Sequence, residues 1–202
     1  MKKVFLALAA VVLSTGAFAQ GAFDQMEWGV KAGLNLANVT KWDGSMKPSI
    51  YLGAFAEFRI NDYLGIQPEV LYSRQGSYDK IDGTKFWMRM NYLNIPILAK
   101  IYLLDELSLD LGPQFGILLN AKMRYKDDDG SGTRDVDDLK NFDVSFPIGL
   151  SYRIGNFDIS ARYVLGLTKV GVPTIGNLPF FGNKDVKKAK NSVIQIGAGY
   201  RF

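Results

Sequence analysis

Apolar and polar residues alternate one by one along most of the chain, and this period of two predicts β-strands. In the stretch WGVKAGLNLAN, residues 28–38, every second residue from Trp28 to Leu36 is apolar, and most residues between them are small or polar. The same alternation recurs often enough to predict eight strands, at residues 28–38, 50–60, 64–73, 91–103, 107–120, 143–154, 157–168 and 193–202. An even number of antiparallel strands of about ten residues fits an all-β fold, an eight-stranded antiparallel up-and-down β-barrel.

Two kinds of eight-stranded barrel fit this pattern, and they differ in the face that points inward. A soluble barrel turns its apolar face inward, whereas a transmembrane barrel turns it toward lipid. Glycine weakens strands, yet it collects on the polar face, where a narrow lumen needs small residues beside large ones such as Tyr51 and Phe55. The apolar face carries no Lys, Arg, Asp or Glu, as contact with hydrocarbon requires. Both observations favour the transmembrane barrel. The glycines of the polar face are Gly29, Gly33, Gly53, Gly65, Gly112, Gly116, Gly149, Gly166, Gly197 and Gly199.

The connections between the predicted strands alternate in length. Those after the second, fourth and sixth strands are tight turns, whereas the others are long, at residues 39–49, 75–90, 121–142 and 169–191. This asymmetry is typical of outer-membrane barrels, which have short periplasmic turns and longer extracellular loops. Aromatic residues near the strand ends are expected to form the interfacial girdles. They are Trp28, Tyr72, Tyr152, Phe157 and Tyr200.

The N-terminal segment has the pattern of a secretory signal peptide. Lys2 and Lys3 precede an apolar run over residues 4–12, which is too short to span a bilayer, and Ala17-Phe18-Ala19 suits cleavage after Ala19. We therefore expect a signal peptide at residues 1–19 and an outer-membrane β-barrel at residues 20–202. Cleavage leaves 183 residues and lowers the formal net charge from +4 to +2, which indicates no nucleic-acid partner. The chain contains no cysteine, so we expect a barrel without disulfides.

Several segments carry a resemblance to a known family. The segments WGVKAGLNLANV, YLNIPILAKIY, FPIGLSYRIGN and ARYVLGLTKV resemble the PorT-like outer-membrane β-barrel family of Bacteroidota over essentially the whole mature chain. The ending IQIGAGYRF looks like the terminal aromatic strand that the barrel-assembly machinery reads during insertion. The family includes a member tied to type IX secretion and many proteins with no assigned role. The resemblance therefore implies a location in the cell outer membrane more firmly than it implies a particular function.

The residue types present exclude most catalytic sites. The chain contains no histidine and no cysteine, which excludes Ser-His-Asp and Cys-His catalysis and the usual zinc sites. Carboxylate chemistry by Glu57 and Glu69 on adjacent strands is the remaining enzymatic alternative. We expect instead that the lumenal charges pair with one another and plug the barrel, because buried charges need partners. The lumenal charges are Glu57, Glu69, Asp110 and Asp158 with Lys31, Arg59, Lys100, Arg153, Arg162 and Arg201.

Two of the long connections contain candidate binding chemistry. The segment KDDDGSGTRDVDD matches part of a calcium-loop pattern but lacks the final glutamate, and a solvated acidic loop is the alternative. The matching residues are Asp127, Asp129, Ser131, Gly132 and Asp138. The last connection places Lys184, Lys187, Lys188 and Lys190 near Phe180 and Phe181. Such a cluster suits lipopolysaccharide phosphates or an anionic partner, although ordinary surface charge explains it as well.

These observations predict a non-enzymatic integral outer-membrane barrel with a side-chain-filled lumen. We expect no catalytic residue, cofactor or metal site, and a structural or accessory role through the loops in envelope assembly or type IX secretion. The expected partners are outer-membrane lipids and lipopolysaccharide, the barrel-assembly machinery during insertion, and an envelope or secretion protein. A small pore or solute-binding barrel is the first alternative, and a carboxylate-dependent enzyme is the second.

Overall fold

The computed structural model describes residues 26–39, 45–81, 84–126, 131–135, 142–169 and 190–202. Within these ranges no helix is long and apolar enough to cross a membrane. The predicted signal peptide, residues 1–19, lies outside the described residues. The strands are β1 (Met26–Val39), β2 (Ser45–Arg59), β3 (Leu64–Ile81), β4 (Thr84–Tyr102), β5 (Leu107–Leu111), β6 (Gln114–Lys126), β7 (Ser131–Asp135), β8 (Phe142–Ile154), β9 (Phe157–Lys169) and β10 (Lys190–Arg201).

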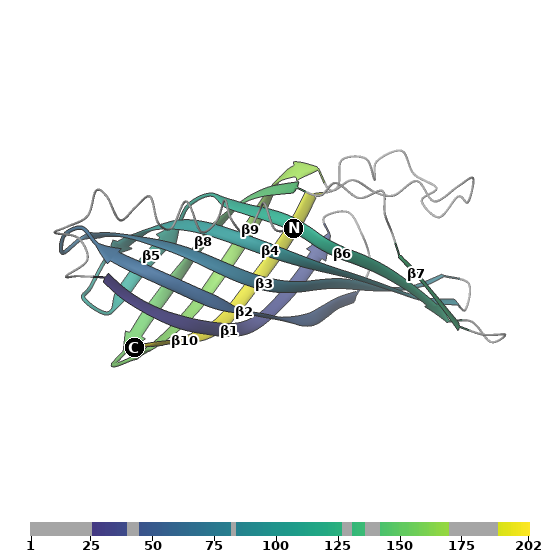
Figure 1. The fold of residues 1–202 in the computed structure, drawn as a ribbon, viewed down its shortest axis with the longest axis horizontal. Helices are drawn as coiled ribbons and strands as arrows, with labels where there is room; N and C mark the ends of the chain where they lie inside the picture. The colour runs from purple at the N-terminus through teal and green to yellow at the C-terminus, as the bar shows by residue number, and fades with distance from the viewer. Residues whose placement is uncertain (1–25, 40–44, 82–83, 127–130, 136–141, 170–189) are drawn as a thin grey trace.

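The strands close into a barrel in which each pairs antiparallel with its neighbours in the chain (Figure 1). β5 and β6 together form a single barrel strand, because both lie between β4 and β8 and only Gly112 and Pro113 separate them. β7 pairs with β6 beyond the barrel, and β1 pairs with β10 to close it. The result is the eight-stranded antiparallel barrel that the sequence predicts.

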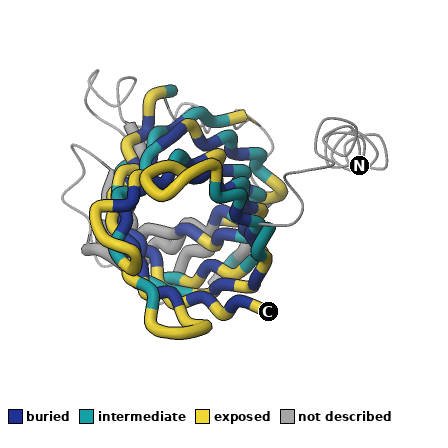
Figure 2. Tube along the Cα trace, turned by 90° about the vertical axis from the view of Figure 1, so that its left-hand side faces the viewer, coloured by how far each residue is buried: buried dark blue, intermediate teal, exposed yellow. Residues whose placement is uncertain are grey.

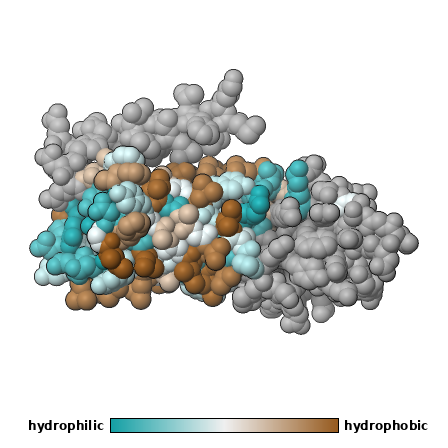
Figure 3. All heavy atoms as spheres, turned by 90° about the horizontal axis from the view of Figure 1, so that it is seen from below, coloured by the Kyte–Doolittle hydropathy of each residue, from teal (hydrophilic) through white to brown (hydrophobic). Residues whose placement is uncertain are grey.

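Burial alternates along the strands, and it is the apolar side chains that are exposed and the polar ones that are buried, the reverse of a soluble protein. Leu34 is 51% exposed, whereas its neighbour Asn35 is fully buried. Buried and exposed positions alternate around the ring of strands in Figure 2, and apolar side chains gather on the outer surface in Figure 3. An apolar exterior and a polar interior are the arrangement that lipid contact requires, so the predicted orientation of the two faces is confirmed.

Aromatic rings cover glycines inside the barrel where β1 and β10 meet. Gly33 and Gly197 are direct partners in register, and the Tyr51 ring lies against both of them. An added Cβ at Gly33 would come within 2.7 Å of Tyr51 Cε1, and one at Gly29 would come equally close to Phe55 Cζ. These glycines therefore make space for the large lumenal side chains, as the sequence pattern suggests.

The outer surface of the same seam carries an aromatic cluster. The Trp28 and Phe202 ring centroids are 4.5 Å apart, and the Tyr200 ring stands edge-on to Phe202 and to Phe157. The Phe202 backbone N–H also donates to the Trp28 carbonyl oxygen at 3.0 Å. The last residue of the chain thus helps to join the first and last strands.

Tight turns connect the strands at this end of the barrel, which we call the turn end. We call the opposite end of the barrel the extended end.

Two of the predicted long connections are largely strand. β3 and β4 remain paired from the barrel out to Ile81 and Thr84, and β6 continues to Lys126 with β7 beside it. Residues 75–90 and much of 121–142 therefore extend the sheet past the barrel instead of forming loops, as Figure 1 shows at the far end of β3, β4, β6 and β7. Asp82-Gly83 is a dipeptide typical of two-residue hairpin turns, and this signal could have revealed the extension.

A β-bulge changes the phase of β6. Asn91 pairs with Asn120, but the next residue of β4, Tyr92, pairs with Leu118, so Leu119 is an extra residue. The sequence alternation predicts that Asn120 faces the lumen, and this prediction is wrong. Asn120 is exposed and Ala121 is buried, because the bulge reverses the inside–outside order of the residues beyond it.

We predict that the Gly197→Ala substitution destabilises the barrel by about 1–3 kcal/mol, because the new Cβ would overlap the Tyr51 hydroxyl and approach the Ala32 carbonyl oxygen at 2.6 Å. The matched control is Gly65→Ala, whose Cβ would meet its nearest atom only at 3.3 Å. Urea unfolding of both variants in detergent micelles measures the difference. Equal stability of the two variants would contradict the proposed packing of Tyr51 on glycine.

Candidate functional site

Among the residues that the structure describes, ten charged side chains of the lumen contact one another, and together they come from all eight barrel strands. Five are carboxylates and five are cations, so the network has no formal net charge. This balance matters because an unpaired charge inside a barrel is costly. The residues are Glu27, Glu57, Glu69, Asp110 and Asp158 with Lys31, Lys100, Arg153, Arg162 and Arg201.

The first centre of the network is Glu69. The Arg162 guanidinium donates two hydrogen bonds of 2.8 Å to the two Glu69 carboxylate oxygens, which is the bidentate geometry of a strong ion pair. Lys31 Nζ lies 2.9 Å from the same carboxylate, and all three side chains are at most 4% exposed. β3 and β9, which supply Glu69 and Arg162, lie four strands apart around the ring of eight. The ion pair therefore crosses the lumen and joins opposite walls.

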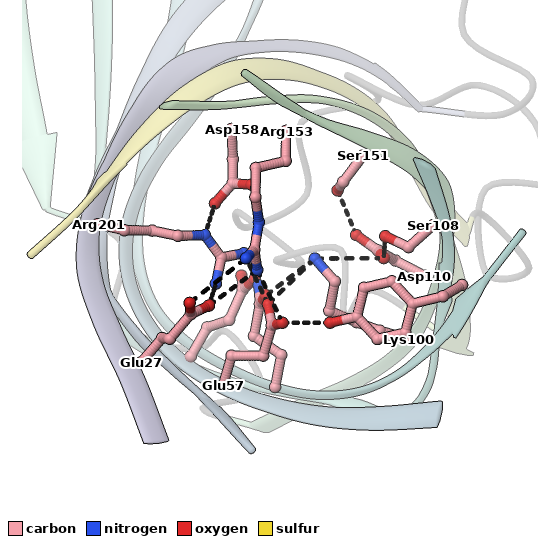
Figure 4. A network of polar contacts seen from close by, with 12 residues as sticks. Glu27, Glu57, Lys100, Ser108, Asp110, Ser151, Arg153, Asp158 and Arg201 are labelled. Atoms are coloured by element: carbon pink, nitrogen blue, oxygen red, sulfur yellow. Dashed lines mark hydrogen bonds and ion pairs between the residues drawn. The ribbon is translucent and has the colours of Figure 1, made fainter. Parts of the chain in front are cut away.

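The second centre is Glu57, nearer the turn end (Figure 4). Its carboxylate accepts hydrogen bonds from Arg201 at 2.6 Å and Arg153 at 3.1 Å, and from the Tyr102 hydroxyl. Lys100 Nζ lies 3.4 Å away. β8, which carries Arg153, is also four strands from β2, so a second contact crosses the lumen.

Arg201 connects the second centre to the barrel seam. In addition to Glu57, its guanidinium contacts Glu27 at 2.5 Å and Asp158 at 2.6 Å. These carboxylates lie on β1, β2 and β9, on both sides of the strand β10 that carries Arg201. A single cation thus links the first and last strands through their side chains as well as their backbones.

Asp110 connects the two centres. Its carboxylate lies 3.4 Å from Arg162 of the first centre and 3.8 Å from Lys100, which contacts the second. Ser108 and Ser151 donate hydrogen bonds of 2.8 Å and 2.5 Å to the same carboxylate. Each oxygen of this fully buried side chain has a partner, and the charged residues form one continuous network.

The lumen toward the extended end is occupied mainly by uncharged groups, and its carboxylate Asp143 accepts a hydrogen bond from the Thr168 hydroxyl. Asn35 donates to Ser73 at 2.8 Å and accepts from Gln195 at 2.9 Å, and Gln114 donates to Ser145 at 3.0 Å. Beyond these amides, the apolar side chains of Met90, Tyr92, Ala121 and Leu118 pack together. The ion-paired network therefore occupies the part of the interior nearer the turn end, and amides and apolar side chains fill most of the rest.

The geometry does not favour the carboxylate-enzyme alternative. Glu57 and Glu69 each contact at least two cations, so both carboxylates are held in ion pairs and not presented to a substrate. Within the described residues, no group of three or more His, Cys, Asp or Glu side chains is placed to hold a metal ion. The ion pairs cross the lumen and brace its walls.

The structure brings together most of the charged residues that the sequence predicts. Arg59 lies apart from the network, over the Tyr102 ring at 4.2 Å and 3.8 Å from the exposed Asp105. Glu27 is the network member that the sequence analysis missed, since it precedes the predicted first strand. Extending the alternation backward from Gly29 by two residues would have found it.

Both candidate loop sites fall largely outside the described residues. This is true of Asp127, Asp129 and Asp138 of the calcium-like pattern, whereas Ser131 and Gly132 begin β7 in register with β6. Phe180, Phe181, Lys184, Lys187 and Lys188 of the aromatic and lysine cluster also lie outside, and Lys190 begins β10. The calcium site and the anionic contact remain predictions.

We predict that Glu69→Gln destabilises the barrel by about 3–5 kcal/mol, because it leaves Arg162 and Lys31 without their shared buried partner. The double variant Glu69→Gln, Arg162→Met keeps the network neutral and should be less destabilised than Glu69→Gln alone, and the single variant Arg162→Met completes the cycle. Urea titrations in micelles measure this double-mutant cycle. Additive effects of the two substitutions would contradict a direct coupling across the lumen.

Comparisons with known proteins agree with this architecture. Three similar solved structures are the Ail attachment invasion locus protein of Yersinia pestis in complex with the heparin analogue sucrose octasulfate, Neisserial surface protein A, and a major outer membrane protein from Thermus thermophilus. Their identities are 20%, 15% and 16%, and their TM-scores are 0.50, 0.51 and 0.52. Each alignment covers 88% of this chain and 99%, 97% and 99% of the respective structure. At these identities the likeness concerns the fold.

The sequence comparisons are more specific about the family. A search of curated protein sequences finds no match. The model of the outer membrane protein beta-barrel domain family matches residues 18–171, which is most of the chain. The polar lumen and the exposed apolar exterior are the features that this location demands. The chain belongs to the outer membrane protein beta-barrel domain family and is an outer-membrane protein.

Proposed function

We propose that this protein is a plugged, non-enzymatic barrel with a structural or accessory role, performed by the segments that project beyond the membrane. The observation that supports this proposal most directly is the Glu69–Arg162 ion pair, which crosses the lumen with two 2.8 Å hydrogen bonds. An eight-stranded barrel has an interior just wide enough for side chains. A buried ion pair between opposite walls leaves little room for a solute, so the lumen serves stability and not transport.

The extended end supplies the surface for such a role. Outer-membrane barrels have short periplasmic turns and longer extracellular connections, so the turn end faces the periplasm and the extended end faces outward. β3, β4, β6 and β7 form a paired sheet beyond the barrel at the outward end. We propose that this extension binds another envelope component. The resemblance to PorT-like proteins makes a secretion component one such partner.

The route to the membrane is a further part of the proposal. Cleavage after Ala19 would release the barrel domain into the periplasm. The barrel-assembly machinery would then receive the strand that ends on Phe202. The contacts of Phe202 and Tyr200 with the rings of Trp28 and Phe157 support a role for this strand in closing the barrel after insertion.

We predict that the mature wild-type barrel shows no discrete conductance steps in planar lipid bilayers. The variant Glu69→Gln, Arg162→Met removes the cross-lumen ion pair without changing the net charge, and it should show brief openings. The control variant Arg59→Gln, Asp105→Asn neutralises an ion pair outside the network. It should remain silent like the wild type.

The recordings separate the plugged barrel from the pore alternative. Reproducible steps from wild-type monomers would contradict the proposed plug and support a small pore. Silence of the wild type and of both variants would show that the Glu69–Arg162 pair is not what closes the lumen.

The accessory role has its own test. Formaldehyde crosslinking in intact cells, followed by purification of the barrel, should recover an envelope protein at a stoichiometric level. A variant in which Asp-Gly replaces residues 77–88 shortens the β3–β4 extension and should lose that partner while still inserting as a barrel. Recovery of the barrel alone from wild-type cells, relative to an unrelated outer-membrane barrel, would contradict the accessory role.

A further inference from the structure

A row of polar side chains crosses the outer surface of the barrel where the apolar surface ends. Arg74 of β3, Asn91 of β4 and Asn120 of β6 occupy directly paired positions on three adjacent strands. The row one step nearer the turn end is Tyr72, Leu93 and Ile117, which is apolar or amphipathic. The polar row therefore lies at a sharp boundary in surface chemistry.

The position of this boundary agrees with the thickness of a membrane. Arg74 follows Leu64, the first residue of β3, by ten residues. At about 3.3 Å per residue and a tilt of about 40°, this segment spans about 25 Å, the usual height of the apolar band of a transmembrane barrel. Because β3 runs from the periplasmic turn outward, Arg74 lies at the level of the headgroups of the outer leaflet.

The hydrogen bonds within the row leave donors available and occupy the acceptors. Arg74 Nε donates to Asn91 Oδ1 at 3.4 Å, and Asn91 Nδ2 donates to Asn120 Oδ1 at 2.5 Å. The groups not used by these contacts are the two terminal guanidinium nitrogens of Arg74 and the amide nitrogen of Asn120. Among the side chains that the structure describes, which exclude those of residues 76–89, no carboxylate lies within ion-pair distance of Arg74. The row thus presents a positive charge and N–H donors, which complement an anionic oxygen.

The bulge in β6 is what completes the row. If residues 118–121 alternated regularly, without the bulge, Asn120 would point into the lumen and Ala121 outward. The bulge instead places Leu119 and Asn120 on the outer surface, so that Asn120 reaches Asn91. β-bulges commonly serve to redirect a side chain, and here the redirected group is an amide at the edge of the apolar surface.

We propose that Arg74, Asn91 and Asn120 form a binding site for the phosphorylated sugar headgroup of lipopolysaccharide. The Arg74 guanidinium binds a phosphate through its two terminal nitrogens, and the Asn120 amide donates to a sugar hydroxyl. Three neighbouring strands spaced by about 4.8 Å make the row about 10 Å long, which suits a sugar headgroup better than a single phosphate. Tyr72 lies one row below, where an amphipathic ring contacts the start of the acyl region.

The test measures lipid binding to the mature barrel in detergent by native mass spectrometry. The lipids are phosphorylated lipid A, dephosphorylated lipid A and phosphatidylglycerol. Wild-type protein should bind phosphorylated lipid A more tightly than either of the other two. Arg74→Gln should weaken that binding about fivefold, the effect of one cation near an anionic lipid surface, and Arg74→Lys should retain part of it. Arg59→Gln removes the same charge at the periplasmic end and should leave binding unchanged.

The contribution of the Asn120 side-chain amide is tested separately. Asn120→Leu should weaken binding of lipid A and leave binding of phosphatidylglycerol unchanged. Asn120 lies two strands, about 10 Å, from Arg74; the sugar headgroup spans this distance, whereas the glycerol hydroxyls of phosphatidylglycerol stay close to its phosphate. Equal affinity of wild type and Arg74→Gln for phosphorylated lipid A would overturn the proposal. Equal affinity of wild type for phosphorylated and dephosphorylated lipid A would do the same. If Arg74→Gln weakened phosphatidylglycerol binding as strongly as lipid A binding, the site would be a general anionic-lipid contact and the assignment to lipopolysaccharide would be wrong.

Discussion

The ion pair between Glu69 and Arg162 is the contact on which the interior depends, because it joins opposite walls of a barrel whose interior is largely polar. The residues that would form the core of a soluble barrel face lipid here, as the exposure of Leu34, Leu52 and Ile159 shows. Much of the interior is therefore filled by polar groups, and these groups need partners away from bulk water. Equal numbers of carboxylates and cations meet this requirement, and Asp110 links them into one network.

The distribution of charge along the lumen follows from the same constraint. The charged network lies toward the turn end, where the first and last strands must be joined and Arg201 contacts carboxylates of β1, β2 and β9. Toward the extended end, the strands continue past the barrel and are held by backbone pairing, so amides and an apolar cluster around Tyr92 suffice. Side-chain bracing is thus greatest where the sheet stops.

Much of this architecture could be predicted from the sequence because a barrel wall imposes a strict period of two. The alternation identifies all eight strands, and the glycines on the polar face, such as Gly33 and Gly197, reveal which face points inward. The alternation also places the charges in the lumen. It does not show which charges meet, since Glu69 and Arg162 become neighbours only after the sheet closes. Arg59 illustrates this limit, because its position at a turn takes it to Tyr102 and Asp105 instead.

The features that the sequence did not reveal lie where the alternation of apolar and polar residues shifts by one residue or stops. A bulge inserts one extra residue into a strand without changing the local composition. Nothing in the sequence near Leu119 therefore indicates that Asn120 turns outward. The strands beyond the apolar band lose the alternation itself, because both faces of the projecting sheet lie outside lipid and no longer need opposite chemistry. Lipid thus enforces the pattern that makes the barrel predictable. The two places where the pattern fails, the polar row at Arg74 and the projecting sheet, are where the protein leaves the bilayer and is free to bind something else.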